Sequence, residues 1–191
     1  MSHPLDSTAC LFTLIGWFLG FHYDQAIYFS FKDPLTQAYN RRFVLRVFPK
    51  LVKKVNKEGS HFCLFILDCN NFKAINDNYG HKIGDKVLYH VSKVLMENTR
   101  TQDIVARWGG DEFLILTTMP TESAINSFQN RLHHEIAKLS HVMKLEISVS
   151  IGVSVSKGQL RSLQHMIQDT DKELYNQKQT LDRTEMQIIV Q

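Results

Sequence analysis

Two groups of acidic residues stand beside short apolar runs of the kind that form buried strands. Asp68 lies at the end of "HFCLFILDC" (residues 61–69), and Asp111 and Glu112 lie within "IVARWGGDEFLILT" (residues 104–117). If the two strands are neighbours, their carboxylates approach one another and repel unless a cation lies between them. Mg²⁺ suits such a place, because it is commonly held by one or two carboxylates together with substrate phosphates. The alternative is an ordinary turn followed by two exposed acids.

The residues around these acids also suit a phosphate-containing ligand. Gly109 and Gly110 have no side chains, so a phosphate or ribose can approach the backbone closely, and we expect them to form a hairpin turn with positive φ. After the first acid, residues 70–85 ("NNFKAINDNYGHKIGD") form a polar loop that leads into a helix. Taken singly, Asn76 could form an Asx turn and Asp85 could cap the helix. Because Asn76 and Asp85 occur together in one loop that follows Asp68, they favour a ligand site.

The spacing of apolar residues predicts the elements that must position this chemistry. Helical spacing recurs in residues 43–55, where Pro49 should kink or split the helix, and in residues 84–95, 125–139 and 163–175. Strands are expected at residues 61–69, 104–108, 112–117 and 145–155, with "EMQIIV" (residues 185–190) as a possible edge strand. Strict alternation in residues 145–155 predicts a strand with one face, mostly serine and glutamate, half in solvent. The order indicates an α+β fold, with a mixed, largely antiparallel sheet of about five strands flanked by helices.

The composition limits the class of partner. The chain has 191 residues, 43% hydrophobic and 21% charged, which suits one globular domain with a short appendage. The net charge of +3 is mild and spread along the sequence, so a nucleic-acid polymer is not expected as a partner. The three cysteines form no zinc-type set, which fits a reducing cytosol, and Cys63 is expected in the core.

The N-terminal segment, residues 1–32, differs from the domain expected over residues 33–191. From Cys10 to Phe21 it carries no charge. A helix of this stretch is roughly 20 Å long, against a hydrocarbon core of about 30 Å, so it would span a bilayer only marginally. We therefore weigh a membrane anchor or interfacial helix against a helix packed on the domain or on a partner. Lysine and arginine follow the stretch and do not precede it, so an inserted segment would leave the domain facing the cytoplasm.

Four stretches resemble, in order and spacing, the motifs of the GGDEF-domain family, the diguanylate cyclases of bacteria. "RWGGDEF" (residues 107–113) contains the five-residue signature that names the family. The other three are "DPLTQAYNRR" (residues 33–42), "LDCNNFKAINDNYGHKIGD" (residues 67–85) and "DKELYNQK" (residues 171–178). The resemblance implies a fold like the palm of nucleotide polymerases and adenylyl cyclases. It also implies the condensation of two GTP into cyclic di-GMP, with release of two pyrophosphates, between the two subunits of a homodimer.

The resemblance also implies roles for individual residues. Asp68, Asp111 and the carbonyl of Cys69 match ligands of Mg²⁺ or Mn²⁺, and Glu112 matches a metal ligand or a base for the 3′-hydroxyl. We place Asp111, Glu112 and Lys73 in the catalytic group. The residues that match the GTP-binding positions, including the guanine contacts and a phosphate-binding lysine, are Phe72, Lys73, Asn76, Asp85, Gly109, Gly110 and Lys178.

One further stretch resembles a ligand-binding site of the family, and another departs from the family pattern. "RTQD" (residues 100–103) has the spacing of the family's inhibitory site, where Arg100 and Asp103 would bind cyclic di-GMP; a surface ion pair is the alternative. Leu181 and Asp182 stand where the family usually has Gly-Arg, which puts phosphate binding and rate in question. The alternative function is a weak or inactive module that acts as a cyclic di-GMP receptor or a GTP-binding regulator.

Overall fold

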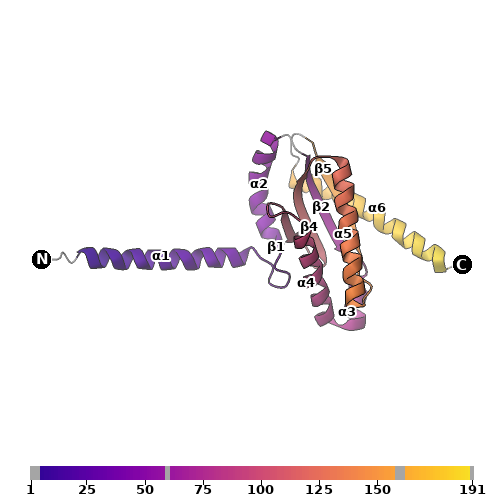
Figure 1. Cartoon of the computed structure of the whole chain (residues 1–191), viewed down its shortest axis with the longest axis horizontal. Coiled ribbons are helices and arrows are strands. Elements are labelled where there is room, and N and C mark those ends of the chain that lie inside the picture. Colours follow the sequence, from indigo (N-terminus) through magenta and orange to yellow (C-terminus); the bar gives the residue numbers. More distant parts are fainter. Residues whose placement is uncertain (1–4, 59–60, 158–161, 190–191) are drawn as a thin grey trace.

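The computed structural model describes the backbone of residues 5–58, 61–157 and 162–189. Along the chain, helices and strands are interleaved (Figure 1). The helices are α1 (Leu5–Ser30), α2 (Arg41–Glu58), α3 (Phe72–Tyr79), α4 (His81–Glu97), α5 (Glu122–Met143) and α6 (Leu163–Ile189). The strands are β1 (Tyr39–Asn40), β2 (His61–Cys69), β3 (Ile104–Arg107), β4 (Glu112–Met119) and β5 (Val149–Ser156).

One five-stranded sheet, in the order β1-β3-β4-β2-β5, organises the domain. The central strand β2 pairs antiparallel with β4 on one side and with β5 on the other, and β3 and β4 form the predicted antiparallel hairpin. The one parallel pair of this sheet joins the short strand β1 to β3. The predicted α+β class, with a mixed and largely antiparallel sheet, is therefore confirmed.

The two faces of the sheet bury different apolar clusters. On one face, Phe65 of β2 packs in a cluster with Val91 of α4 and Phe128 of α5. On the other face, Ile66 of β2 packs in a cluster with residues of α2 and α6, such as Phe48. Because side chains of a strand alternate between the faces, β2 is buried on both, which explains its unbroken apolar sequence. Cys63 lies in this core as predicted, and burial raises the pKa of its thiol to about 12.

The C-terminal residues correct two predictions. "EMQIIV" is not an edge strand, because its residues up to Ile189 belong to α6. No Gly or Pro follows Leu174 to end that helix, and the edge position next to β3 is taken by β1 instead. The serine face of β5 is also not half in solvent: Ser150, Ser154 and Ser156 are buried. They are covered because α6 packs closely on β5 at Gly152.

One further prediction in the N-terminal half of the domain is wrong, and one alternative of another is excluded. Residues 70–85 are not a single loop, since α3 forms within them and is followed directly by α4. Pro49 lies inside α2, which continues through it, so the predicted split of this helix is excluded. The first correction matters for the site, because α3 turns loop residues into one wall of a pocket.

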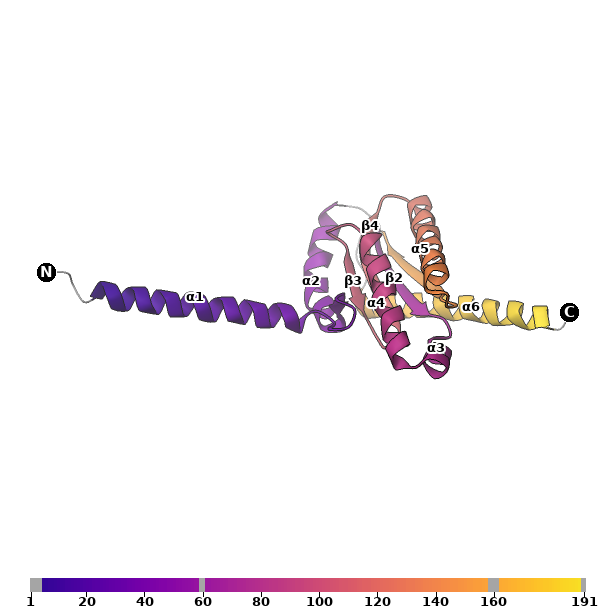
Figure 2. The same ribbon diagram turned by 60° about the horizontal axis from the view of Figure 1, so that its bottom comes forward.

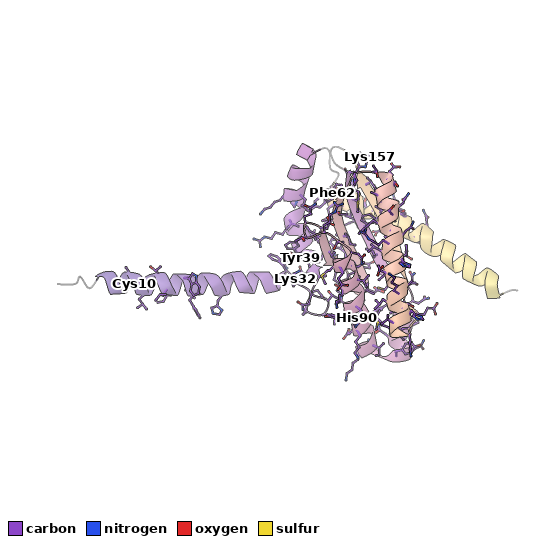
Figure 3. All side chains as sticks on the ribbon, in the orientation of Figure 1. Cys10, Lys32, Tyr39, Phe62, His90 and Lys157 are labelled. Atoms are coloured by element: carbon purple, nitrogen blue, oxygen red, sulfur yellow. The ribbon has the colours of Figure 1, made fainter. Side chains whose placement is uncertain are left out.

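Helix α1 extends away from the domain, and α6 extends from it in another direction (Figure 1, Figure 2). The side chains of residues 8–20 are exposed, including Phe12 and Trp17, so this part of α1 does not pack on the domain. No helix in the described part of the chain combines the length and the apolar character needed to cross a bilayer. Where the chain enters the domain, the Lys32 ammonium lies 3.7 Å from the centre of the Tyr39 ring (Figure 3). Tyr39 also stacks on Phe43.

Candidate active site at the ends of β2 and β4

The two groups of acids meet because β2 and β4 are neighbours in the sheet. Asp68 stands opposite Glu112 in the antiparallel register. Beyond this pair, the backbone amide of Cys69 donates to the carbonyl oxygen of Asp111 at 3.2 Å. All three acids are partly buried. The prediction that the strand ends adjoin is thus confirmed, and the carboxylates are carried by directly bonded backbone segments.

A pocket of about 400 Å³ opens beside these strand ends. It is bounded by α3, by the start of α4 and by the turn between β3 and β4. Six of the predicted site residues line it: Phe72, Lys73, Asn76, Asp85, Gly110 and Asp111. Four lining residues were not predicted as site residues: Asp77, His81, Leu88 and Arg107. Asp77 and His81 lie in the polar stretch that the sequence singled out, so their position in that stretch was the available signal.

Close contact between α3 and α4 shapes the first wall of the pocket. Gly80 joins the two helices with φ of 82°, a conformation that favours glycine. Gly84 is buried, and a methyl group added there would overlap the side chain of Asn76 and press on Phe72. Because Gly84 has no side chain, Asn76 of α3 can lie against α4, the helix that carries Asp85.

The turn between β3 and β4 forms the opposite wall, and it differs from the prediction. Neither Gly109 nor Gly110 has a positive φ. The backbone amides of Trp108 and Gly109 both donate to the carbonyl oxygen of Glu112, at 2.8 and 3.3 Å. A methyl group at Gly109 would lie 2.7 Å from a carboxylate oxygen of Glu112, whereas one at Gly110 would meet nothing within 4 Å. Gly109 thus makes room for the Glu112 side chain, and Gly110 leaves the pocket side open.

Arg107 is a basic residue of the site that the sequence reasoning missed. Its guanidinium pairs with Asp33 at 3.2 Å and donates to the carbonyl oxygen of Gly110. Partial burial alone would raise the pKa of Asp33, but hydrogen bonds from Thr36 and the nearby Arg107 charge outweigh it and lower the pKa. Asp33 belongs to the motif "DPLTQAYNRR", which gave no hint of a contact with the turn.

The acids of the site carry oxygen atoms of the kind that bind Mg²⁺ or Mn²⁺. Within the described residues, no three His, Cys, Asp or Glu side chains are grouped so that they could hold a metal ion. Asp68 and Asp111 supply hard oxygen ligands from adjoining segments, which suits Mg²⁺ or Mn²⁺ once further oxygens, such as those of a triphosphate, complete the coordination. The residues present therefore fit a cation that binds together with a phosphate ligand.

The remaining predicted site residues lie outside the pocket or outside the described residues. Asp68, Cys69 and Glu112 lie at the adjoining strand ends, and Gly109 lies in the turn between β3 and β4; none of the four lines the pocket. The side chain of Lys178 on α6 falls outside the described part of the chain, as do those of Leu181 and Asp182.

Arg100 and Asp103 form a tight turn before β3. The Asp103 carboxylate accepts from the Arg100 backbone amide at 2.8 Å and from the Thr117 hydroxyl at 2.7 Å. Among the ion pairs found in the described residues, none joins the Arg100 guanidinium to Asp103. The surface ion pair considered above is therefore wrong. The Arg100 side chain is exposed. The Asp103 carboxylate stabilises the turn through its hydrogen bonds with the Arg100 amide and the Thr117 hydroxyl.

Comparison with known proteins identifies relatives of this site and fold. The family described as diguanylate cyclase, GGDEF domain, matches residues 30–184. Diguanylate cyclase DosC of Escherichia coli is 33% identical over 147 residues, which cover 75% of this chain and 32% of that protein. Diguanylate cyclase A of Treponema denticola is 30% identical over 153 residues, which cover 77% of this chain and 41% of that protein. The chain thus spans about a third of the length of the curated relatives it matches first.

Solved structures share the fold. The coiled coil and GGDEF domain of DgcB from Caulobacter crescentus, in complex with c-di-GMP, superimposes with a TM-score of 0.82 at 24% identity; the match covers 93% of this chain and 96% of that one. A microbial GGDEF domain studied for its interaction with cyclic di-GMP superimposes with a TM-score of 0.69 at 31% identity, over 78% of this chain and 94% of that one. The palm-like fold expected from the sequence is confirmed by these matches.

Proposed function

Because the chain belongs to the GGDEF-domain family, we propose that it is a diguanylate cyclase that condenses two GTP molecules into cyclic di-GMP. One observation carries the proposal: a single pocket brings together Asn76, Asp85 and Asp111, next to the strand end that holds Asp68. They come from two motifs, residues 67–85 and residues 107–113, which the fold brings to one pocket. No observation favours the alternative of an inactive receptor or regulator.

The α3–α4 wall would recognise the guanine base. The Asp85 carboxylate can accept hydrogen bonds from N1–H and from the 2-amino group of guanine, with Asn76 beside it. Adenine offers neither donor at these positions, so ATP would leave Asp85 desolvated and without its hydrogen bonds, and such a penalty excludes the wrong base. Gly84 supports this reading, since it keeps Asn76 and Asp85 on one wall of the pocket.

The opposite side of the site would bind the triphosphate. Asp68, Asp111 and the Cys69 carbonyl would hold Mg²⁺ or Mn²⁺, which neutralises phosphate charge and stabilises the attacking and leaving oxygens. Lys73 lines the pocket and would add positive charge near the phosphates. Glu112 lies across from Asp68 and would complete the acid group, as a ligand or as the base for the 3′-hydroxyl.

The proposed reaction needs two copies of the chain, because each copy would hold one GTP in this pocket and each 3′-hydroxyl must attack the GTP held by the partner. Helix α1 supports a homodimer, since its exposed side chains include Phe12, Trp17 and Leu19. Apolar helix surfaces of this kind are commonly covered by a partner helix. The solved structure of DgcB from Caulobacter crescentus comprises a coiled coil and a GGDEF domain, and its match covers 93% of this chain.

Product would limit the activity through Arg100 and Asp103. The exposed Arg100 side chain can bind a phosphate or a guanine edge of cyclic di-GMP. Asp103 is held in place by the Arg100 amide and the Thr117 hydroxyl, which supports its use as a fixed acceptor.

The function is tested by incubating the full chain with GTP and Mg²⁺ and separating the products by chromatography. We expect cyclic di-GMP and pyrophosphate in a ratio of one to two, and no product in the presence of a chelator. An Asp111→Ala variant should form at least about a hundredfold less product. A folded, dimeric wild-type protein that leaves GTP unchanged, or an Asp111→Ala variant as active as wild type, would overturn the proposal.

A further inference from the structure

The donors of Arg107 are directed at the protein itself, although the residue lines the pocket. Nε and Nη2 donate to the Gly110 carbonyl oxygen at 3.1 and 2.7 Å. Nη1 donates to the two carboxylate oxygens of Asp33 at 3.2 and 3.3 Å. All three guanidinium nitrogens therefore hold the chain, and the residue bridges two segments that are far apart in sequence.

Asp33 is itself fixed by its own loop. Its carboxylate oxygen Oδ1 also accepts from the backbone amide and the hydroxyl of Thr36, both at 2.8 Å. Thr36 is fully buried, and its carbonyl oxygen accepts from the Ser92 hydroxyl of α4 at 3.0 Å. An unbroken chain of hydrogen bonds thus runs from the turn before β4, through Arg107, Asp33 and Thr36, to α4.

The two ends of this chain lie on two elements that each contribute residues to the pocket, the turn before β4 and helix α4. One end holds Gly110, the residue before Asp111, and the other reaches the helix that carries Asp85. We propose that Arg107 is a positioning residue that fixes the turn bearing Asp111 relative to α4, through Asp33, without contacting the ligand. This inference rests on the proposed function, in which Asp111 and Asp85 act on the same nucleotide.

The geometry requires arginine at this position. The guanidinium is a planar fork that satisfies a carboxylate and a carbonyl at once, whereas a lysine ammonium is a single point charge that cannot span both. Arg107→Lys should therefore lower kcat about as much as Arg107→Gln does. Loss of the Arg107 contact should move Asp111 away from its working position and lower the rate of the chemical step more than nucleotide affinity.

The catalytic test compares Arg107→Lys, Arg107→Gln and Asp33→Asn with wild type. Arg131→Gln is the matched control, because Arg131 also donates to a backbone carbonyl, that of Asn98 at 3.0 Å, and neither residue lines the pocket. We expect kcat to fall about tenfold or more for both Arg107 variants, with KM and the Kd of 3′-deoxy-GTP, which cannot cyclise, within about threefold of wild type. The kcat of the double variant Asp33→Asn/Arg107→Gln should be no lower than the kcat of Arg107→Gln alone.

A second measurement does not depend on turnover. The amides of Trp108 and Gly109 should exchange with solvent about tenfold faster in Arg107→Gln than in wild type, and at the wild-type rate in Arg131→Gln. Unchanged exchange would overturn the positioning role whether or not the protein is a cyclase. A raised KM at unchanged kcat would also overturn it, since Arg107 would then contact the nucleotide. Failure of the proposed function would appear separately, as absence of cyclic di-GMP from wild type and Arg131→Gln alike.

Discussion

The backbone amide of Cys69 donates a hydrogen bond to the carbonyl oxygen of Asp111, with a nitrogen–oxygen distance of 3.2 Å. This bond joins the last residue of β2 to the residue that precedes β4. Asp68 and Asp111 therefore lie on backbone segments that separate only if the centre of the sheet opens. A fixed pair of carboxylates is what a metal-assisted reaction on a triphosphate needs from the protein.

Asp85 should determine the preference for guanine. Wild-type protein should use GTP about tenfold or more better than ITP, which lacks the 2-amino group, because one hydrogen bond to a charged acceptor is lost. In Asp85→Ala, kcat/KM should fall for both nucleotides and their ratio should approach one. The exposed neighbour variant Lys86→Ala should keep the wild-type ratio. A GTP-to-ITP ratio that survives in Asp85→Ala would show that other groups read the base.

Gly84→Ala should damage the guanine wall of the pocket. The added methyl group overlaps the Asn76 side chain and presses on Phe72, so we expect a loss of about 1–3 kcal/mol in the free energy of unfolding. The displaced Asn76 should also raise KM for GTP. Gly110→Ala is the control for stability, since its methyl group meets no atom within 4 Å and should cost less than about 0.5 kcal/mol. Urea unfolding of both variants checks the prediction, and equal losses would contradict it.

Because of the ion pair between Arg107 and Asp33, the free energy of unfolding should fall at acidic pH. Although burial opposes it, the contacts from Thr36 and Arg107 lower the pKa of Asp33 below its model-compound value of 3.8. The stability from this carboxylate is thus fully present above that unfolded-state pKa and is lost as the pH falls through the lower native pKa. At pH 7, the free energy of unfolding of wild type should exceed that of Asp33→Asn by about 1–2 kcal/mol.

The difference between wild type and Asp33→Asn should narrow when unfolding is measured from pH 5 to pH 3. In an Arg107→Gln background, the same comparison should give a smaller difference with a weaker pH dependence, because one of the stabilising partners is gone. A difference that stays constant down to pH 3 would contradict the assigned role of the Asp33 charge.

Arg100→Ala should separate product inhibition from folding. The Arg100 side chain is exposed, and the backbone amide that binds Asp103 remains in the variant, so stability should change by less than about 0.5 kcal/mol. The concentration of cyclic di-GMP that halves the rate should rise about tenfold or more. Asp103→Ala removes the acceptor of two hydrogen bonds and should lose both inhibition and stability. Unchanged inhibition in Arg100→Ala would exclude this site.

Apolar spacing predicts the main elements of this fold because their buried faces are regular. The run of β2, the hairpin of β3 and β4 and the stripes of α4 and α5 all follow from it. The same spacing misleads at the C-terminus, where "EMQIIV" suits either a strand or a helix, and at β5, where small serines are covered by α6. Burial by a distant element is a tertiary effect that local alternation does not contain.

The motifs predict which residues gather at the site, but not how the turn is held. Asn76, Asp85, Gly110 and Asp111 meet in one pocket as the motifs imply. The contact of Arg107 with Asp33 joins residues 74 positions apart, and it was not expected because each residue belongs to a different motif. Gly109 was expected to provide a positive φ, whereas the structure uses its missing side chain to accommodate Glu112.

The most direct test of the account is a crystal structure of the full chain with Mn²⁺ and 3′-deoxy-GTP, in which anomalous scattering locates the metal. We predict manganese in contact with the carboxylates of Asp68 and Asp111 and with the triphosphate, and the guanine base against Asp85. Manganese held by the triphosphate and water alone, with neither aspartate as a ligand, would contradict the account.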